Sequence, residues 1–424
     1  MNLPIQVTFA LPSLVAKGLQ DGTLERVGGV IRDVISKKIV TWLRDSNSVA
    51  PSVISVAANP VTGILNLIAS GANAAISAKG FSDVNQRLDG VENKIDSIGQ
   101  TLQVSQSILQ VSTAASILNL GVSVMGFAVI AQRLNEIENQ LKQAQELLNK
   151  INRKIDMSFY ANFRAGIELA INAFTMTKIE NRRSSALQAI NRFLEAEHIY
   201  KDYTVNELSQ KSQIIDKYIL TLSLAYIAEA RCYLELEEHE TAIRRFEEGT
   251  KVIRLLVNNY IEIMLTSNPA AYLHPQFKGQ IDLCKLTKIY RWINPTLNEN
   301  SVFDILRENI FKLAQNNNEW LSSLPSSIVD RNEISWGLFG GNPTPLTGRF
   351  EKQAFQRLPQ VFEVMESIIE TNNRFESYQT EIQAISQLGI SFHEWLQLKP
   401  STEPKPEGAE LMFIIPSQPL ELPG

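Results

Sequence analysis

The histidines and cysteines are the residues of this chain best suited to catalysis or metal binding, and none of them lies in a recognisable motif. They are His198, His239, His274, His393, Cys232 and Cys284. A zinc hydrolase needs two histidines one helical turn apart with a glutamate beside them, and a structural zinc site needs paired CxxC spacings. Neither spacing occurs here. A GxSxG nucleophile elbow, the protein kinase motifs, an EF-hand loop and the glycine-rich phosphate loops are missing from the sequence as well.

These observations predict a non-enzymatic protein with no catalytic residue, no bound metal and no cofactor. Each histidine is expected to be a surface or packing residue. Glu237, Glu238 and Glu240 surround His239 and predict a solvated, charge-rich turn rather than an acid and base pair.

Length and charge limit the remaining classes of function. A chain of 424 residues is longer than the roughly 250 to 300 residues that usually fold around a single hydrophobic core, so two or more packed units are expected. The composition, 44% hydrophobic and 20% charged with a net charge of -5, is that of a globular protein. No long basic cluster is present, so nucleic acid is not an expected partner.

An uncharged segment is the strongest functional signal in the sequence. Residues 97–132, between Asp96 and Arg133, carry no charge. Residues 109–130 supply the roughly 20 mostly apolar residues that a helix needs to cross a bilayer. The residues predicted to insert into a membrane are Leu109, Ile117, Leu118, Leu120, Val122, Val124, Met125, Phe127, Val129 and Ile130. The lipid bilayer is therefore the first expected partner.

The geometry of insertion is open between a hairpin and a single span. Gln100, Gln103, Gln106 and Gln110 recur at three to four residues, so one arm of a hairpin could present a polar face to water. In the resting protein we expect the segment to pack inside a helical bundle. Exposing about 20 apolar side chains to water, at roughly 1.5 to 3 kcal/mol each, would be prohibitive.

A seven-residue apolar repeat borders the uncharged segment on each side and predicts coiled-coil arms. The upstream repeat is Phe81, Val84, Leu88, Val91, Ile95, Ile98 and Leu102, and the downstream repeat is Leu134, Ile137, Leu141, Ala144, Leu148, Ile151 and Ile155. Gly80, Gly90 and Gly99 weaken the upstream arm and are the hinge candidates. The arms could pair within one chain or between chains, so self-association is a second expected interaction.

The predicted fold is mainly α: an elongated helical bundle with coiled-coil arms flanking an apolar helical segment, followed by a second helical domain. We divide the chain into residues 1–45, a small element; 46–160, the membrane-active region; 161–400, a helical domain; and 401–424, a Pro-rich tail. Residues 1–45 fit a short hairpin or mixed element and a helical start broken by glycines about equally well. The tail is expected to be extended, with residues 412–415 anchoring it on a surface.

The domain at residues 161–400 is expected to hold one helix pair with tetratricopeptide-like spacing, or an ordinary helix pair. The residues that carry this spacing are Ala230, Cys232, Tyr233, His239, Ala242, Ile243, Phe246 and Gly249. A second copy at the expected period is absent from the sequence. The C-terminal helices are the expected site for a protein partner.

The order coiled coil, apolar segment, coiled coil over about residues 46–160 resembles the α-helical pore-forming toxins of the cytolysin A and haemolysin BL type. The resemblance implies a helical bundle that opens, inserts its apolar region and oligomerises into a ring. Unlike those toxins, this chain has no lysine or arginine before Lys17 and contains Pro4 and Pro12, so no secretory signal is recognised. We expect a soluble protein made in the cytoplasm, with conditional membrane association and signal-less export left open.

The expected function is therefore a pore-forming or membrane-disrupting toxin or effector that inserts its apolar segment after a conformational change. The alternative is a soluble coiled-coil and helical scaffold that binds protein partners.

Overall fold

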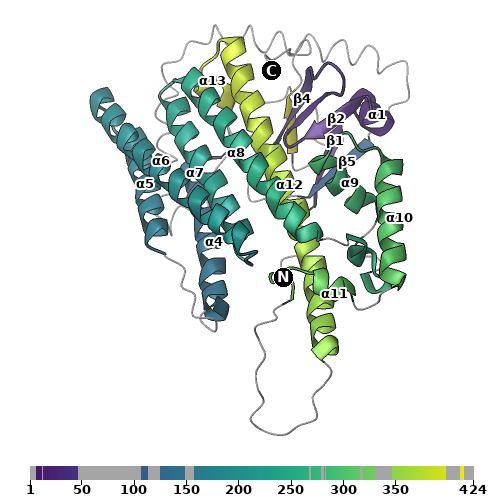
Figure 1. Ribbon diagram of the computed structural model, residues 1–424. Helices are drawn as coiled ribbons and strands as arrows, with labels where there is room; N and C mark the ends of the chain where they lie inside the picture. Colours follow the sequence, from purple (N-terminus) through teal and green to yellow (C-terminus); the bar gives the residue numbers. More distant parts are fainter. Residues whose placement is uncertain are drawn as a thin grey trace. The chain divides into compact units, whose positions relative to one another are not determined.

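The structure is a computed structural model that describes residues 6–11, 13–45, 107–112, 125–148, 157–266, 269–277, 281, 283–315, 319–329, 346–397 and 411–414 (Figure 1). The described part is mainly helical, which confirms the predicted fold class. Its α-helices are α1 (Ser13–Asp21), α4 (Phe127–Leu148), α5 (Ser158–Thr175), α6 (Ile179–Ser209), α7 (Ile215–Glu235), α8 (His239–Leu265), α9 (Leu283–Ile293), α10 (Glu299–Gln315), α11 (Glu319–Ser323), α12 (Leu346–Leu388) and α13 (Phe392–Gln397). Two short 3-10 helices, Pro269–Leu273 and Pro275–Phe277, follow α8.

The chain divides into two compact units whose ranges interleave along the sequence. The first unit comprises residues 1–199, 221–251 and 371–424, and the second comprises residues 200–220 and 252–370. The helices α6, α7, α8 and α12 each contribute one part to the first unit and the other part to the second.

Residues 1–45 form a mixed element, in which α1 precedes three strands of a four-stranded antiparallel sheet in the first unit. Its strands are β2 (Leu24–Val27), β3 (Val30–Asp33), β4 (Ile39–Asp45) and β6 (Leu411–Ile414), in that order. The strand β6 comes from the tail and pairs with β4, with Phe413 opposite Leu43. Residues 412–414 of the segment expected to anchor the tail thus lie in a strand paired with β4, and the β-branched and aromatic residues of β4 favour extended backbone.

A glycine turn joins β2 to β3 and brings the hairpin against α12. Gly28 has a φ of +57°, and a Cβ atom there would lie 2.6 Å from the Arg374 Cα atom. Only glycine fits this position, because any side chain would meet the α12 backbone. The next amide, of Gly29, donates a hydrogen bond to Ser377 Oγ at 3.2 Å. On β4, the Trp42 ring meets the Trp395 ring edge-on at 5.5 Å.

A separate two-stranded pair, β1 (Gln6–Leu11) with β5 (Ser107–Ser112), is antiparallel, with Phe9 opposite Leu109.

The helices α5 to α8 form the body of the first unit together with the end of α12. Phe163 of α5 meets Phe193 of α6 edge-on at 5.7 Å. The predicted helix pair corresponds to α7 and α8. A Cβ atom on Gly249 would lie 2.9 Å from the ring of Tyr226, so the glycine lets these helices approach closely. Phe246 continues the packing to Phe375 of α12, with ring centroids 5.1 Å apart.

In the second unit, two helices end just before residues that disfavour a continued helix, Pro269 after α8 and the pair Asn294 and Pro295 after α9. The helix α8 ends at Leu265, and α9 ends at Ile293. The hydroxyl of Tyr272, in the 3-10 segment, donates to the carbonyl oxygen of Met264 at 2.7 Å. The guanidinium of Arg254 on α8 lies 3.7 Å from the centre of the Trp292 ring on α9. This cation–π contact stabilises the packing of α9 on α8.

Candidate functional site

The described end of the uncharged segment is buried where α4 begins. Met125, Phe127 and Ile130 have almost no exposed surface, whereas Val129 is half-buried. The Phe127 ring stacks on Phe174 of α5 with nearly parallel planes and centroids 5.8 Å apart. Four of the residues predicted to insert into a membrane therefore lie at a helix packed on its neighbour in the same chain.

The described part of the downstream seam also faces the interior of the first unit. Leu134, Ile137 and Leu141 are buried along one face of α4. Glu138 is buried on this helix, and its carboxylate lies 3.4 Å from Arg164 of α5 and 2.8 Å from Lys142. Leu148 is the last residue of α4. These three seam residues thus pack within the first unit of the chain.

Leu109 requires a correction. The sequence places it at the start of an inserting helix, but it lies in the strand β5. The residues around it, Ile108 and Val111, are β-branched and favour extended backbone. The deciding partner is β1, about 100 residues away in the chain, which supplies the hydrogen-bonding groups of the pair.

Several predicted residues lie outside the described part of the chain. They are the inserting residues Ile117, Leu118, Leu120, Val122 and Val124, the seam residues Leu88, Val91, Ile95 and Ile151, and the hinge candidates Gly80, Gly90 and Gly99. Their roles remain predictions. Among the helices that the structure describes, none combines the length and the apolar character needed to cross a membrane.

The histidines lie apart from one another in varied surroundings. His198 is exposed, and the ring of His274 packs 4.7 Å from the ring of Phe355. His393 Nε2 lies 3.4 Å from a carboxylate oxygen of Glu235. His239 is partly buried, and that burial lowers its pKa. Within the described residues, no three histidine, cysteine or acidic side chains gather as a metal site would require.

The turn between α7 and α8 matches its expected character. Glu237, Glu238 and Glu240 are all exposed, and Glu237 has a φ of +61° in the turn itself.

The most unusual electrostatic feature is a buried carboxylate cluster that the sequence analysis missed. Glu197 of α6 and Glu229 of α7 are 4% and 0% exposed at their side chains. Both bind the guanidinium of Arg245 on α8, with Nε 2.7 Å from Glu229 Oε2. Glu248 accepts from Nη1 of the same arginine at 2.5 Å. One cation therefore faces three acidic groups, two of them buried.

Both buried glutamates have raised pKa values. Burial and the neighbouring Glu229 raise the pKa of Glu197 to about 10, and burial also raises the pKa of Glu229. The Oε1 atoms of both residues are buried, and neither has a partner if both groups are ionised. With its raised pKa, Glu197 keeps its proton at neutral pH, and a protonated carboxyl can donate a hydrogen bond where a carboxylate only accepts. Burial and the neighbouring carboxylates also raise the pKa of the Tyr226 hydroxyl.

One signal in the sequence could have found this cluster. Glu229 follows a run of uncharged residues, 218–228, within one predicted helical stretch. An isolated carboxylate in such a position is either paired or neutral. Its partners on α6 and α8 come from other parts of the chain and are not readable from spacing.

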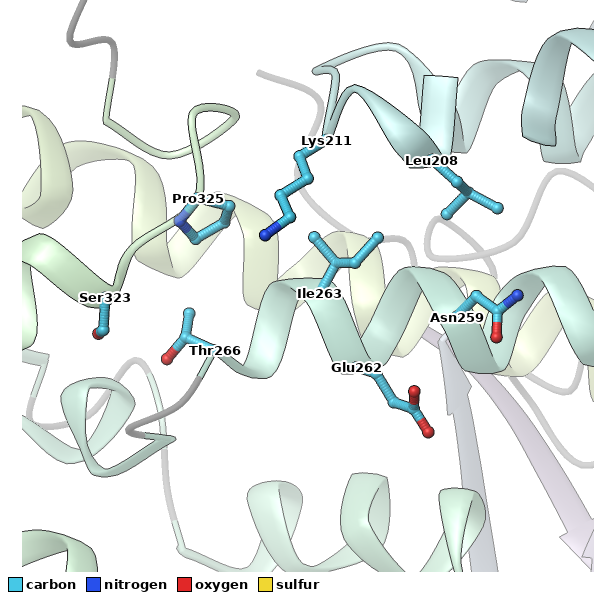
Figure 2. Close-up of a pocket in the computed structure, with 8 residues that line it drawn as sticks. All are labelled: Leu208, Lys211, Asn259, Glu262, Ile263, Thr266, Ser323 and Pro325. Carbon is cyan, nitrogen blue, oxygen red and sulfur yellow. The ribbon is translucent and has the colours of Figure 1, made fainter. Parts of the chain in front are cut away.

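A groove opens in the second unit beside the ends of α6 and α8 (Figure 2). Its volume is about 590 Å³. It is lined by Leu208, Lys211, Asn259, Glu262, Ile263, Thr266, Ser323 and Pro325. The lining combines an aliphatic surface with two charges of opposite sign, two hydroxyls and an amide. None of these residues was singled out from the sequence, since they belong to separate segments.

Comparison with protein-family models, with curated proteins and with solved structures found no match for this chain.

Proposed function

We propose that this protein is a non-enzymatic, conditionally membrane-active protein that permeabilises or anchors to a bilayer through the uncharged residues 97–132. The single observation that carries the proposal is the sequence itself, in which these residues bear no charge and are bordered by apolar seams. Insertion would be followed by self-association, as in the toxins that this arrangement resembles.

The packing of α4 supports a resting state in which the segment is held back. Met125, Phe127 and Ile130 are buried at the point where the segment enters α4. Moving them into lipid exchanges one apolar environment for another and avoids the large cost of exposure to water. The contacts that must break first are the stack of Phe127 on Phe174 and the ion pair of Glu138 with Arg164.

Dye release from liposomes tests this proposal directly. Val124→Asp puts a charge in the centre of the segment, where insertion scales assign a cost of about 2.5 to 3.5 kcal/mol. We expect the parent to release dye and Val124→Asp to lose most of this activity, at neutral or acidic pH. The matched control is Leu255→Asp, because Leu255 is an exposed leucine on α8 outside the segment; it should behave as the parent does.

A reversible clamp tests the release of α4. Phe127→Cys with Phe174→Cys, in a Cys284→Ser background, can be joined by a short bifunctional maleimide with a reducible linker. We expect the clamped protein to be inactive and reduction to restore release. If the parent neither releases dye nor floats with lipid, or if Val124→Asp is as active as the parent, the membrane function is wrong.

A helical scaffold for protein partners is the second candidate, and an exposed apolar stripe favours it. Phe303, Ile310 and Phe311 are exposed on α10, and Ile310 and Phe311 lie seven and eight residues after Phe303. This spacing places the three side chains on one side of the helix. Phe311 is 63% exposed. Such a face suits a protein partner of the C-terminal helices. A scaffold predicts that the protein stays in the lipid-free fraction and that Val124→Asp alters only its stability.

A further inference from the structure

The groove beside α6 and α8 has the size and lining of a small-ligand site. Its volume of about 590 Å³ lies within the range of roughly 300 to 1,000 Å³ that such sites occupy. All of its lining residues belong to the second unit. The site is therefore independent of the uncharged segment and of the function proposed for it.

A single lysine, Lys211, supplies the positive charge of the groove lining. Figure 2 shows the Lys211 side chain pointing toward the space between Pro325 and Ile263. Within the described residues, no carboxylate lies within ion-pair distance of its ammonium group. Glu262 is the acidic residue of the lining, and its carboxylate points away from Lys211 in the same view. The lysine is thus available to an anion that enters the groove.

The backbone at both sides of the groove is held in an uncommon conformation. Lys211 follows the end of α6 with a φ of +50°, and Thr266 follows the end of α8 with a φ of +65°. Positive φ is uncommon for residues other than glycine and unusual for a β-branched residue such as threonine. Each residue ends its helix in this way and places its side chain in the groove lining instead of on another helical turn.

The rest of the lining selects the chemistry of the ligand. Leu208, Ile263 and Pro325 offer an aliphatic surface next to the ammonium group, and Thr266 and Ser323 lie at one end of the groove (Figure 2). A lone ammonium beside an aliphatic wall matches a carboxylate with a short aliphatic chain. The carboxylate accepts from Lys211 while the chain covers the wall.

We propose that this groove binds an aliphatic carboxylate, with Lys211 as the residue that binds the acid group. The same chemistry is found at the C-terminus of a peptide that ends in leucine and in a medium-chain fatty acid. Calorimetric titration of the full chain with N-acetylleucylleucine and with octanoate distinguishes these two sources.

The expected result is binding of at least one of the two acids, with its neutral analogue, the dipeptide amide or octanol, binding at least about tenfold more weakly. Lys211→Met keeps the length of the side chain and removes its charge, so it should weaken binding of the acid by about tenfold or more and leave binding of the neutral analogue unchanged. Lys201→Met is the matched control, because Lys201 is exposed on α6 and does not line the groove; it should bind as the parent does.

Three results would overturn the assignment: no binding of either acid at millimolar concentration, equal binding of acid and neutral analogue, or unchanged binding by Lys211→Met. Ile263→Ser gives a second readout, since it reduces the aliphatic wall and should weaken the acid and its neutral analogue alike. A circular dichroism melt of each variant separates loss of the site from loss of the fold.

Discussion

Glu197→Gln tests whether two buried glutamates share a proton. At neutral pH the folded protein holds this proton, whereas an unfolded chain has lost it, because the pKa of Glu197 rises from 4.5 to about 10 on folding. Between these values the folded state binds more protons than the unfolded state. Stability therefore falls as pH rises, by up to about 1.4 kcal/mol per pH unit.

The magnitude follows from the distance of the working pH from the ordinary pKa. At pH 7, holding a proton on a group that would otherwise lose it at 4.5 costs up to about 3 kcal/mol. Glutamine is neutral without that cost, and its amide can donate to Glu229 as the protonated carboxyl does. We expect Glu197→Gln to be more stable than the parent at pH 7 by about 1 to 3 kcal/mol, with the advantage growing toward pH 9.

Urea unfolding followed by circular dichroism at pH 6, 7, 8 and 9 measures this difference. The matched control is Glu195→Gln, two residues away on α6 with an exposed side chain, which should keep the pH dependence of the parent. Infrared spectroscopy adds a direct readout, because the parent should show the band of a buried carboxylic acid at neutral pH and Glu197→Gln should lose it. Parallel pH profiles for the parent and Glu197→Gln, or no acid band in the parent, would refute the shared proton.

Three further substitutions test the packing, each with the midpoint of urea unfolding as the measurement. Gly28→Ala should destabilise the protein by about 2 kcal/mol or more, because the added Cβ atom would meet the α12 backbone. Gly22 also has a positive φ, but a Cβ atom there would contact no other atom, so Gly22→Ala should lower stability by about half as much. Equal losses of stability would contradict the close approach of Gly28 to α12. Ile130→Ala should cost about 2 to 5 kcal/mol because the side chain is fully buried, whereas Ile179→Ala, at a residue 76% exposed, should change stability by less than about 0.5 kcal/mol. Trp395→Phe removes the indole donor to a buried carboxylate and should cost about 1 to 3 kcal/mol; no change would place that tryptophan outside the core.

Local sequence patterns predicted much of the helical structure. The sequence predicted a helical domain over residues 161–400, and the described part of this range is built of helices, including α6 to α8. The turn of Glu237 and Glu238 was predictable because consecutive charges between two apolar helices must face water.

The sequence by itself predicted that residues 161–400 form helices, because helical periodicity acts over a few residues. Only the tertiary structure decided what required partners far apart in the chain. Leu109 lies in a strand because β1 pairs with it, and β6 adds to a sheet that begins almost 400 residues earlier. The pKa values of Glu197 and Glu229 are raised because three helices bury both carboxyl groups beside one guanidinium. Burial of a charge is a property of the packed interior rather than of any local spacing.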